Sequence, residues 1–143
     1  MRRRKIQFAA MLVFALLWVG CGSAVQPSNS SAVDNSAIEN AFQQRQSKVQ
    51  VEGEGVVTRI LSDDVSGSRH QRFIVRLGSG QTLLVTHNLD MAPRVAGLRE
   101  GDVVRFYGEY AWNAEGGVVH WTHHDPEGRH PAGWLKHNGQ TYQ

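Results

Sequence analysis

The chain has 143 residues, of which 41% are hydrophobic, with four prolines and a single cysteine, and this length suits one folded domain. The composition excludes a collagen-like protein, a coiled coil and a disulfide-stapled protein. The 15 Lys and Arg outnumber the 13 Asp and Glu, but four of the basic residues lie at positions 2–5 and no acidic residue precedes Asp34. Without that basic start the balance is 11 minus 13, or −2, so we do not expect nucleic acid as a partner.

Residues 1–21 have the pattern of an export signal. The basic residues 2–5 precede an apolar run, Ile6 to Val19, that is too short to cross a bilayer comfortably. Gly20-Cys21 resembles a bacterial lipobox, which predicts cleavage before Cys21 and lipidation of its thiol. Ordinary signal-peptidase cleavage after Ala24 and an uncleaved anchor are the alternatives. In each case we expect an extracytoplasmic domain at the cell envelope, with no disulfide to stabilise it.

Residues 22–48 are rich in Ser, Asn, Gln and Ala and have little apolar mass to bury. This composition predicts a flexible tether. Within it, Ile38, Ala41 and Phe42 have helical spacing and allow one or two amphipathic turns against the domain.

Residues 49–143 are predicted to form the domain, because alternating apolar residues and glycines indicate strands. The predicted strands are 49–61, 69–77, 81–87, 103–112 and 118–122. Gly53 and Gly55 lie inside the first, where a glycine allows a bend or a close backbone approach. A short irregular helix or loop is expected between Leu89 and Leu98. This order predicts an all-β domain, a five-stranded OB-fold-like Greek-key barrel with one short helical connection, and a small β-sandwich is the alternative.

Five of the seven histidines fall in the last part of the chain, which makes a His-rich tail. The candidate ligand-binding residues are His120, His123, His124, Asp125, His130 and Trp134. If the fifth strand continued through this segment, its alternation would place His120, Thr122 and His124 on one face and Trp121 and His123 on the other.

Two hypotheses give these histidines a chemical role. Imidazoles of His123, His124 and His130, with Asp125, would suit a transition metal such as zinc, copper or nickel, although neither HExxH nor CxxC occurs. A histidine with Asp125 would suit general-base catalysis, but no nucleophile stands out. We favour a third interpretation, in which the histidines form hydrogen bonds at the barrel rim.

Aromatic side chains are the other candidates for ligand contact, since OB barrels stack bases and sugars on them. We expect Trp121 in the core, and Trp134 capping the barrel or partly exposed. Three arginines on one strand are interpreted as a solvated face. The aromatic residues are Tyr107, Tyr110, Trp112, Trp121, Trp134 and Tyr142, and the arginines are Arg69, Arg72 and Arg76.

Six stretches of the chain carry a resemblance to a known family. They are His70-Gln71-Arg72-Phe73, Leu84-Val85-Thr86-His87-Asn88, Gly101-Asp102, Gly108-Glu109-Tyr110, HWTHHDP at 120–126, and Gly133-Trp134. Together they resemble a bacterial family known as domain of unknown function 3465. The resemblance covers about residues 49–142, and HWTHHDP is its most specific part. The family has no established activity, so the resemblance implies an identity without a function.

A second similarity is to the periplasmic haem chaperones of cytochrome c maturation. They too join an N-terminal membrane segment to an OB barrel and carry a haem-attaching histidine in a His-Asp context after the last strand. The resemblance implies that role for His124, next to Asp125. Pro126, Glu127 and Gly128 stand where that family has Glu-Asn-Tyr.

The sequence therefore predicts an exported, lipid-anchored binding module of the cell envelope that is not an enzyme. Its partner would be a small ligand or an envelope protein. The alternatives are a metal- or haem-handling protein that uses the C-terminal histidines, and a secreted hydrolase with a His/Asp site.

Overall fold

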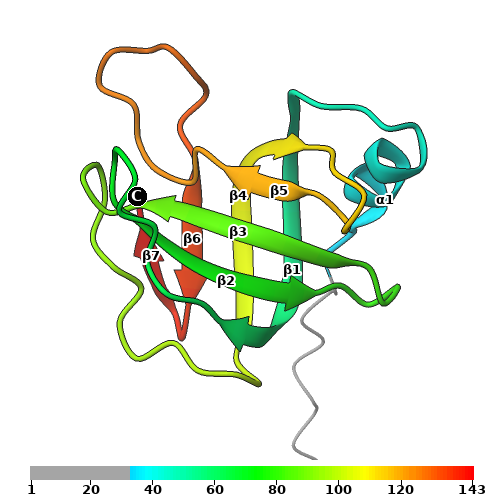
Figure 1. Ribbon diagram of the computed structural model, residues 1–143, viewed down its shortest axis with the longest axis horizontal. Helices are drawn as coiled ribbons and strands as arrows, with labels where there is room; N and C mark the ends of the chain where they lie inside the picture. The colour runs from blue at the N-terminus through cyan, green and yellow to red at the C-terminus, as the bar shows by residue number, and fades with distance from the viewer. Residues whose placement is uncertain (1–32) are drawn as a thin grey trace, which may run out of the picture. The chain divides into compact units, whose positions relative to one another are not determined.

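The computed structural model describes residues 33–143, so the predicted export signal and Cys21 lie outside the described residues. One helix and seven strands make up the described part (Figure 1). They are α1 (Ser36–Gln43), β1 (Val49–Ile60), β2 (His70–Arg76), β3 (Thr82–Asn88), β4 (Val103–Ala111), β5 (Val118–His120), β6 (Trp134–His137) and β7 (Gln140–Tyr142).

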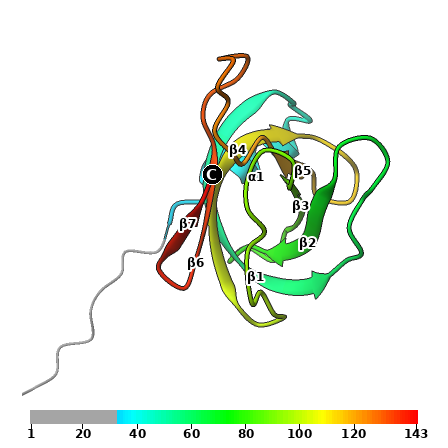
Figure 2. The ribbon, with the colours of Figure 1, turned by 90° about the vertical axis from the view of Figure 1, so that its left-hand side faces the viewer.

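The strands β1 to β5 close into a barrel, which confirms the predicted fold class. The sheet order is β1-β2-β3-β5-β4-β6-β7, and the pairing of β1 with β4 closes the ring (Figure 2). The β3–β5 pair is parallel, and the other pairs are antiparallel. Inward side chains such as Phe73, Val85 and Phe106 fill the interior.

β1 pairs with two strands, β4 and β2, as its length and its glycines predict. Its first part, Val49 to Val56, pairs with β4, and its last part, Val56 to Ile60, pairs with β2 with a register shift between Val57 and Arg59. A Cβ on Gly53 would lie 2.5 Å from Ile38 Cδ1 and 2.6 Å from Phe106 Cζ. Gly53 is therefore required by close packing of the core against it.

The predicted short helical connection is a loop, and the helix lies where the spacing of Ile38, Ala41 and Phe42 allowed one or two amphipathic turns. Residues 89–102 form turns without a helix, whereas α1 lies within the predicted tether. Ile38 and Ala41 are buried in the barrel core, and the Asn35 side chain exchanges two 3.0 Å hydrogen bonds with the Glu54 backbone. α1 is thus an ordered part of the domain within the predicted tether, because the Ile38 side chain fills the space above Gly53. Among residues 33–143, no helix is long and apolar enough to span a membrane.

The His-rich tail is also more regular than predicted. β6 and β7 form a hairpin that adds to the sheet alongside β4, with Leu135 and Tyr142 buried in the core. His137 Nε2 lies 2.8 Å from Asp102 Oδ2, which ties β6 to the turn before β4. The Arg99 backbone N–H and this imidazole both lower the pKa of Asp102.

Candidate functional site

A loop leaves and re-enters the sheet at one edge of β4. His120 pairs with Glu109 and Trp134 pairs with Tyr107, so β5 and β6 follow one another along the same edge. Residues 121–133 are looped out between them, and the Gly133 N–H closes the loop with a 2.8 Å bond to His123 O. A Cβ on Gly133 would lie 2.0 Å from Trp121 O, so only glycine allows this closure. We call residues 121–133 the histidine loop.

Asp125 organises the histidine loop from within. Its side chain has no solvent exposure and accepts backbone N–H bonds from Glu127 (3.0 Å), Arg129 (2.5 Å) and His130 (3.2 Å). Burial alone would raise the pKa of Asp125, but these three donors and the Arg129 charge lower it to about 2. At neutral pH the Asp125 carboxylate is therefore charged, and its hydrogen bonds to the backbone give it a structural role.

Trp121 begins the loop in an unusual conformation. Its φ is 52°, in the left-handed region that a bulky residue rarely adopts, and this ends the alternation of β5. The indole stacks on His130, with centroids 4.5 Å and planes 9° apart, and its other neighbour is the tilted His120 ring at 4.9 Å. His123 meets the edge of His130 at 5.0 Å. The four rings form a continuous row of ring contacts, which we call the ring stack.

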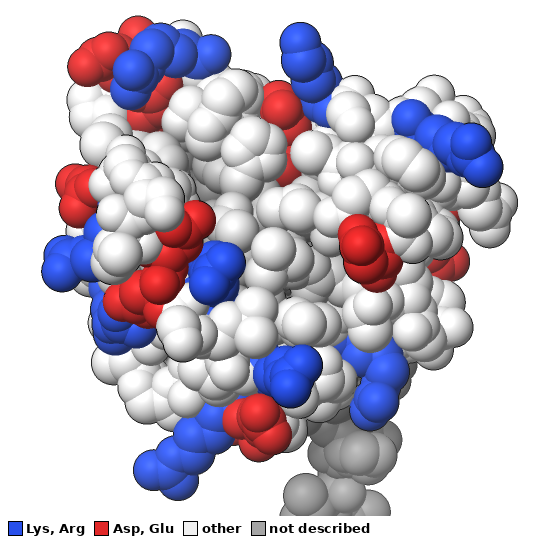
Figure 3. Space-filling view, viewed as in Figure 1, with Lys and Arg blue, Asp and Glu red and all other residues white. Residues whose placement is uncertain are grey.

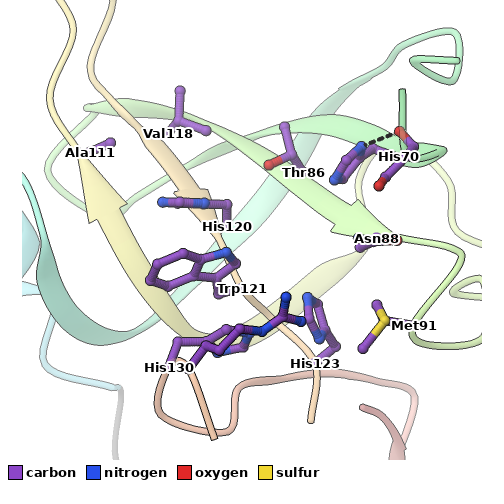
Figure 4. A pocket seen from close by; sticks show the side chains of 12 residues that line it. His70, Thr86, Asn88, Met91, Ala111, Val118, His120, Trp121, His123 and His130 are labelled. Carbon is purple, nitrogen blue, oxygen red and sulfur yellow. Dashed lines mark hydrogen bonds between the residues drawn. The ribbon is translucent and has the colours of Figure 1, made fainter. Parts of the chain in front are cut away.

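The ring stack forms one wall of a pocket on the outer face of the barrel. The pocket has a volume of about 610 Å³ and lies over β2, β3 and β5, a region where most charged side chains lie toward the margin (Figure 3). Figure 4 shows Trp121 between His120 and His130, with Thr86 and Asn88 of β3 across the pocket from them. The lining residues are Ser68, His70, Thr86, Asn88, Met91, Ala111, Val118, His120, Trp121, His123, Arg129 and His130.

Burial keeps two histidines of the wall, His120 and His123, uncharged. Burial lowers the pKa of His120, although Glu109, whose Oε1 lies 3.4 Å from its Nε2, opposes this shift. Burial also lowers the pKa of His123, and the nearby His130 lowers it further. Both rings are therefore uncharged at neutral pH.

His87 supports the loop from the barrel interior. It is fully buried, and its Nε2–H donates to Pro93 O at 3.1 Å. Nδ1 then accepts from the buried Thr122 hydroxyl at 2.8 Å, which fixes the start of the histidine loop. Burial lowers the pKa of His87 to about 4, so this bond involves a neutral ring.

Comparison with protein families gives one match. Residues 20–143 match the family described as "Protein of unknown function (DUF3465)". The chain belongs to the DUF3465 family. No curated protein matches it. The resemblance to the haem chaperones stays a prediction. In this DUF3465 protein the HWTHHDP stretch forms the end of β5 and the first half of the histidine loop.

The structure brings only some of the predicted site residues together. His120, His123 and His130 line the pocket, whereas Asp125 is turned into its own loop and His124 is exposed outside the lining. The set of His123, His124 and His130 therefore does not converge as the metal hypothesis required. Within the part of the chain that the structure describes, no three His, Cys, Asp or Glu side chains are grouped to hold a metal ion.

The two tryptophan predictions have opposite outcomes. Trp121 is 36% exposed, so the prediction of a core position is wrong, because its left-handed φ turns the chain out of the strand. Trp134 is partly exposed, as predicted. It stacks on Tyr107 at 6.1 Å, beneath Lys136 Nζ at 4.4 Å, and it does not line the pocket.

Sequence reasoning missed six of the polar or flexible residues of the pocket, which are Ser68, His70, Thr86, Asn88, Met91 and Arg129. His70 and Asn88 lie opposite one another on β2 and β3, and Met91 and Arg129 come from loops. The available signal was the strand alternation, which places His70 on the outer face of the predicted strand 69–77 and would place Asn88 on the same face if the strand 81–87 continued by one residue.

Proposed function

We propose that this DUF3465 protein is an exported binding module of the bacterial cell envelope, held at the membrane by lipid on Cys21, and that it binds its ligand without catalysis. The basic start, the apolar run and the position of Cys21 support export and lipid attachment. The location of the pocket supports binding, because OB barrels bind ligands on the face that includes the second and third strands.

The conformation of Trp121 is the observation that carries the proposal. A left-handed backbone costs a bulky residue of order 1–3 kcal/mol, and such strain clusters at ligand sites. Here the strain places an indole, 36% exposed, in a pocket wall between two imidazoles. The loop that holds it is fixed by Asp125 and by Gly133, so the wall is formed before any ligand arrives.

The hydrogen bonds that Asp125 and the pocket hydroxyl groups make within the protein favour binding over catalysis. Asp125, the predicted partner of a catalytic histidine, accepts three backbone hydrogen bonds and does not line the pocket. The pocket hydroxyl of Thr86 donates to Val119 O at 3.5 Å. Within residues 33–143 neither Thr86 nor Ser68 has the hydroxyl-to-imidazole bond that would activate a nucleophile.

A fragment screen tests the proposal. Ligand-observed NMR with the full-length protein and a mixed library of neutral, anionic and cationic fragments should find binders whose signals are lost with Trp121→Ala. Trp134→Ala is the matched control, because Trp134 is a partly exposed indole outside the pocket. A screen in which no binder depends on Trp121, or in which binders depend equally on Trp134, contradicts the proposal.

A metal- or haem-handling protein is the second candidate. The Nδ1–H groups of His123 and His130 donate to backbone carbonyls at 2.8 Å, the way in which metal-binding imidazoles are held. The pocket lining, all of it within residues 33–143, offers a cation no carboxylate or thiolate ligand beside these imidazoles. We therefore expect added zinc, copper or haem to leave the melting temperature nearly unchanged, and a rise that His123→Ala and His130→Ala both abolish would favour this candidate instead.

A further inference from the structure

His123 is a buried polar side chain with one free hydrogen-bonding atom. The residue is 4% exposed, and its Nδ1–H donates to His124 O at 2.8 Å. Its Nε2 has no hydrogen-bond partner among residues 33–143. In that part of the chain the only fully buried side-chain atom without a partner is Gln50 Nε2, so His123 Nε2 keeps contact with solvent. Because His123 lines the pocket, that contact is through the pocket.

The free atom is a hydrogen-bond acceptor at neutral pH. Burial lowers the pKa of His123, so the ring is uncharged, and the proton on Nδ1 leaves a lone pair on Nε2. The Nδ1 of His70 is likewise bonded to a backbone carbonyl, Ser68 O at 2.7 Å, the dashed line in Figure 4. Because Nε2 of His123 is open to the pocket, a ligand that carries an O–H or N–H donor can take the place of solvent as its hydrogen-bond partner.

Hydrogen-bond donors and apolar groups share the pocket with these acceptors. Asn88 Oδ1 accepts the Asp90 N–H at 2.9 Å, which leaves the amide NH₂ to donate, and Arg129 adds a guanidinium. Met91, Ala111 and Val118 supply apolar surface between the polar groups. The lining lies entirely within the described residues and contains no acidic residue. The Arg129 guanidinium lies 3.3 Å from Glu127 Oε2 and 3.6 Å from Asp125 Oδ1, so these two carboxylates largely balance its charge.

We infer that the pocket binds a neutral saccharide, one hydroxyl of which donates a hydrogen bond to His123 Nε2. Each sugar hydroxyl both donates and accepts, which matches the mixture of imidazole acceptors and amide and guanidinium donors. The C–H faces of a sugar ring match the apolar surface between them. A volume of about 610 Å³ lies within the usual range for small-ligand sites. This inference rests on the proposed function, because it assigns a ligand class to the same pocket.

Calorimetric titration at pH 7 in the presence of EDTA tests the ligand class without a contribution from metal. The probes are maltose, cellobiose and N,N′-diacetylchitobiose, with glucuronic acid and trialanine as an anionic sugar and a peptide for comparison. At least one neutral disaccharide should bind, and more tightly than glucuronic acid or trialanine. The inference is overturned if none binds, or if trialanine or glucuronic acid binds more tightly.

Two further changes test the role of His123. His123→Asn retains a donor near the position of Nδ1 and removes the acceptor at Nε2, so the affinity for the bound disaccharide should fall about tenfold or more. His124→Asn, an exposed neighbour outside the pocket, should leave the affinity unchanged. Equal affinities of wild type and His123→Asn overturn the inference.

Monodeoxy derivatives of the same disaccharide make the test independent of whether the variant folds. Removal of one particular hydroxyl should reproduce the loss in the wild-type protein, and equal affinities across the whole series overturn the inference. If fragments require Trp121 while no saccharide binds, the saccharide class fails and the proposed function stands. If no fragment requires Trp121, the proposed function itself fails.

Discussion

Trp121 lies flat against His130, with ring centroids 4.5 Å apart, although the two residues are at opposite ends of the histidine loop. The stack and the Gly133–His123 backbone bond close the loop from its two sides. Asp125 accepts N–H bonds between these closures. The loop is thus held by its own side chains, as in the compact surface loops that frequently carry function.

Loss of the His130 ring should destabilise the protein, whereas loss of the neighbouring His124 ring should not. The His130 side chain is 4% exposed, stacks on Trp121 and donates to Pro131 O at 2.8 Å. We expect His130→Ala to lower the free energy of unfolding by about 0.5–1.5 kcal/mol. His124→Ala changes an exposed side chain and should cost under about 0.5 kcal/mol. Urea unfolding measures both, and equal losses would contradict the stacking argument.

A side chain at Gly53 should be far more costly than one at an exposed glycine. A Cβ at Gly53 would meet Ile38 and Phe106 at 2.5 and 2.6 Å, so Gly53→Val should cost about 2 kcal/mol or more. Gly78 is the matched control, because nothing lies within 4 Å of its Cβ position and its φ is not positive. Gly128 is unsuitable because its φ is +65°. Similar melting temperatures for Gly53→Val and Gly78→Val would contradict the packing of α1 over β1.

Asp125→Asn should loosen the histidine loop without unfolding the barrel. An amide offers one acceptor oxygen where the carboxylate offers two, and its NH₂ group opposes the backbone donors of Glu127, Arg129 and His130. Hydrogen exchange at these amides should accelerate roughly tenfold or more, while exchange in β4 stays unchanged. Because the pKa of Asp125 is lowered to about 2, the wild-type protection should persist below pH 3.8 and be lost only as the pH falls toward 2.

The matched control for Asp125 is Glu127→Gln, which removes an exposed carboxylate from the same loop. Its exchange rates should stay near those of the wild type. If the two variants accelerate exchange equally, Asp125 does not have the organising role assigned to it.

Cys21→Ala should release the protein from the membrane fraction or block its maturation, since a thiol is required for lipid attachment. Mass spectrometry of the wild-type N-terminus checks the reason directly, and Gly22→Ala serves as a control that keeps the thiol. A mature product that begins at Val25 and lacks acyl mass would contradict the lipid anchor.

The barrel could be predicted because its strands carry a local signal. The alternation of inward Phe73, Val75 and Leu77 in the sequence recurs as the buried face of β2 and its end. β6 and β7 carry a weaker signal, since each is short and is defined by its pairing with β4 or with the other. The spacing of Ile38, Ala41 and Phe42 predicts only one or two amphipathic turns for a similar reason: the stability of α1 depends on the space that Gly53 leaves in β1.

The candidate site could be predicted only in part, because its geometry depends on contacts between distant residues. The cluster of histidines in the sequence predicts the segment that forms the pocket wall. The outward turn of Trp121 depends on the closure of the loop at Gly133, and the engagement of Asp125 depends on the fold of the loop around it. His70 joined the site from β2, far away in the sequence, through its pairing with Asn88.

His87 should make the folded protein less stable as the pH falls. Burial lowers the pKa of His87 from 6.5 to about 4, so the unfolded chain binds a proton near pH 6.5 that the folded chain does not bind until about pH 4. The contribution of His87 to the free energy of unfolding is therefore complete above pH 6.5 and declines between pH 6.5 and 4, by a few kcal/mol in total. Burial also lowers the pKa of His120 and His123, so these rings add to the decline.

His87→Gln isolates the share of His87, because glutamine fits a polar site beside Thr122 and Pro93 but does not titrate. Urea unfolding followed by tryptophan fluorescence at pH 7, 6, 5 and 4 gives the slope of stability against pH. The variant should be less stable than the wild type at pH 7, because a matched buried hydrogen bond is lost, and its slope should be shallower. His124→Gln, an exposed control, should keep the wild-type slope. Parallel slopes for wild type and His87→Gln would show that His87 does not bind its proton on unfolding, and would contradict the neutral ring inferred for it.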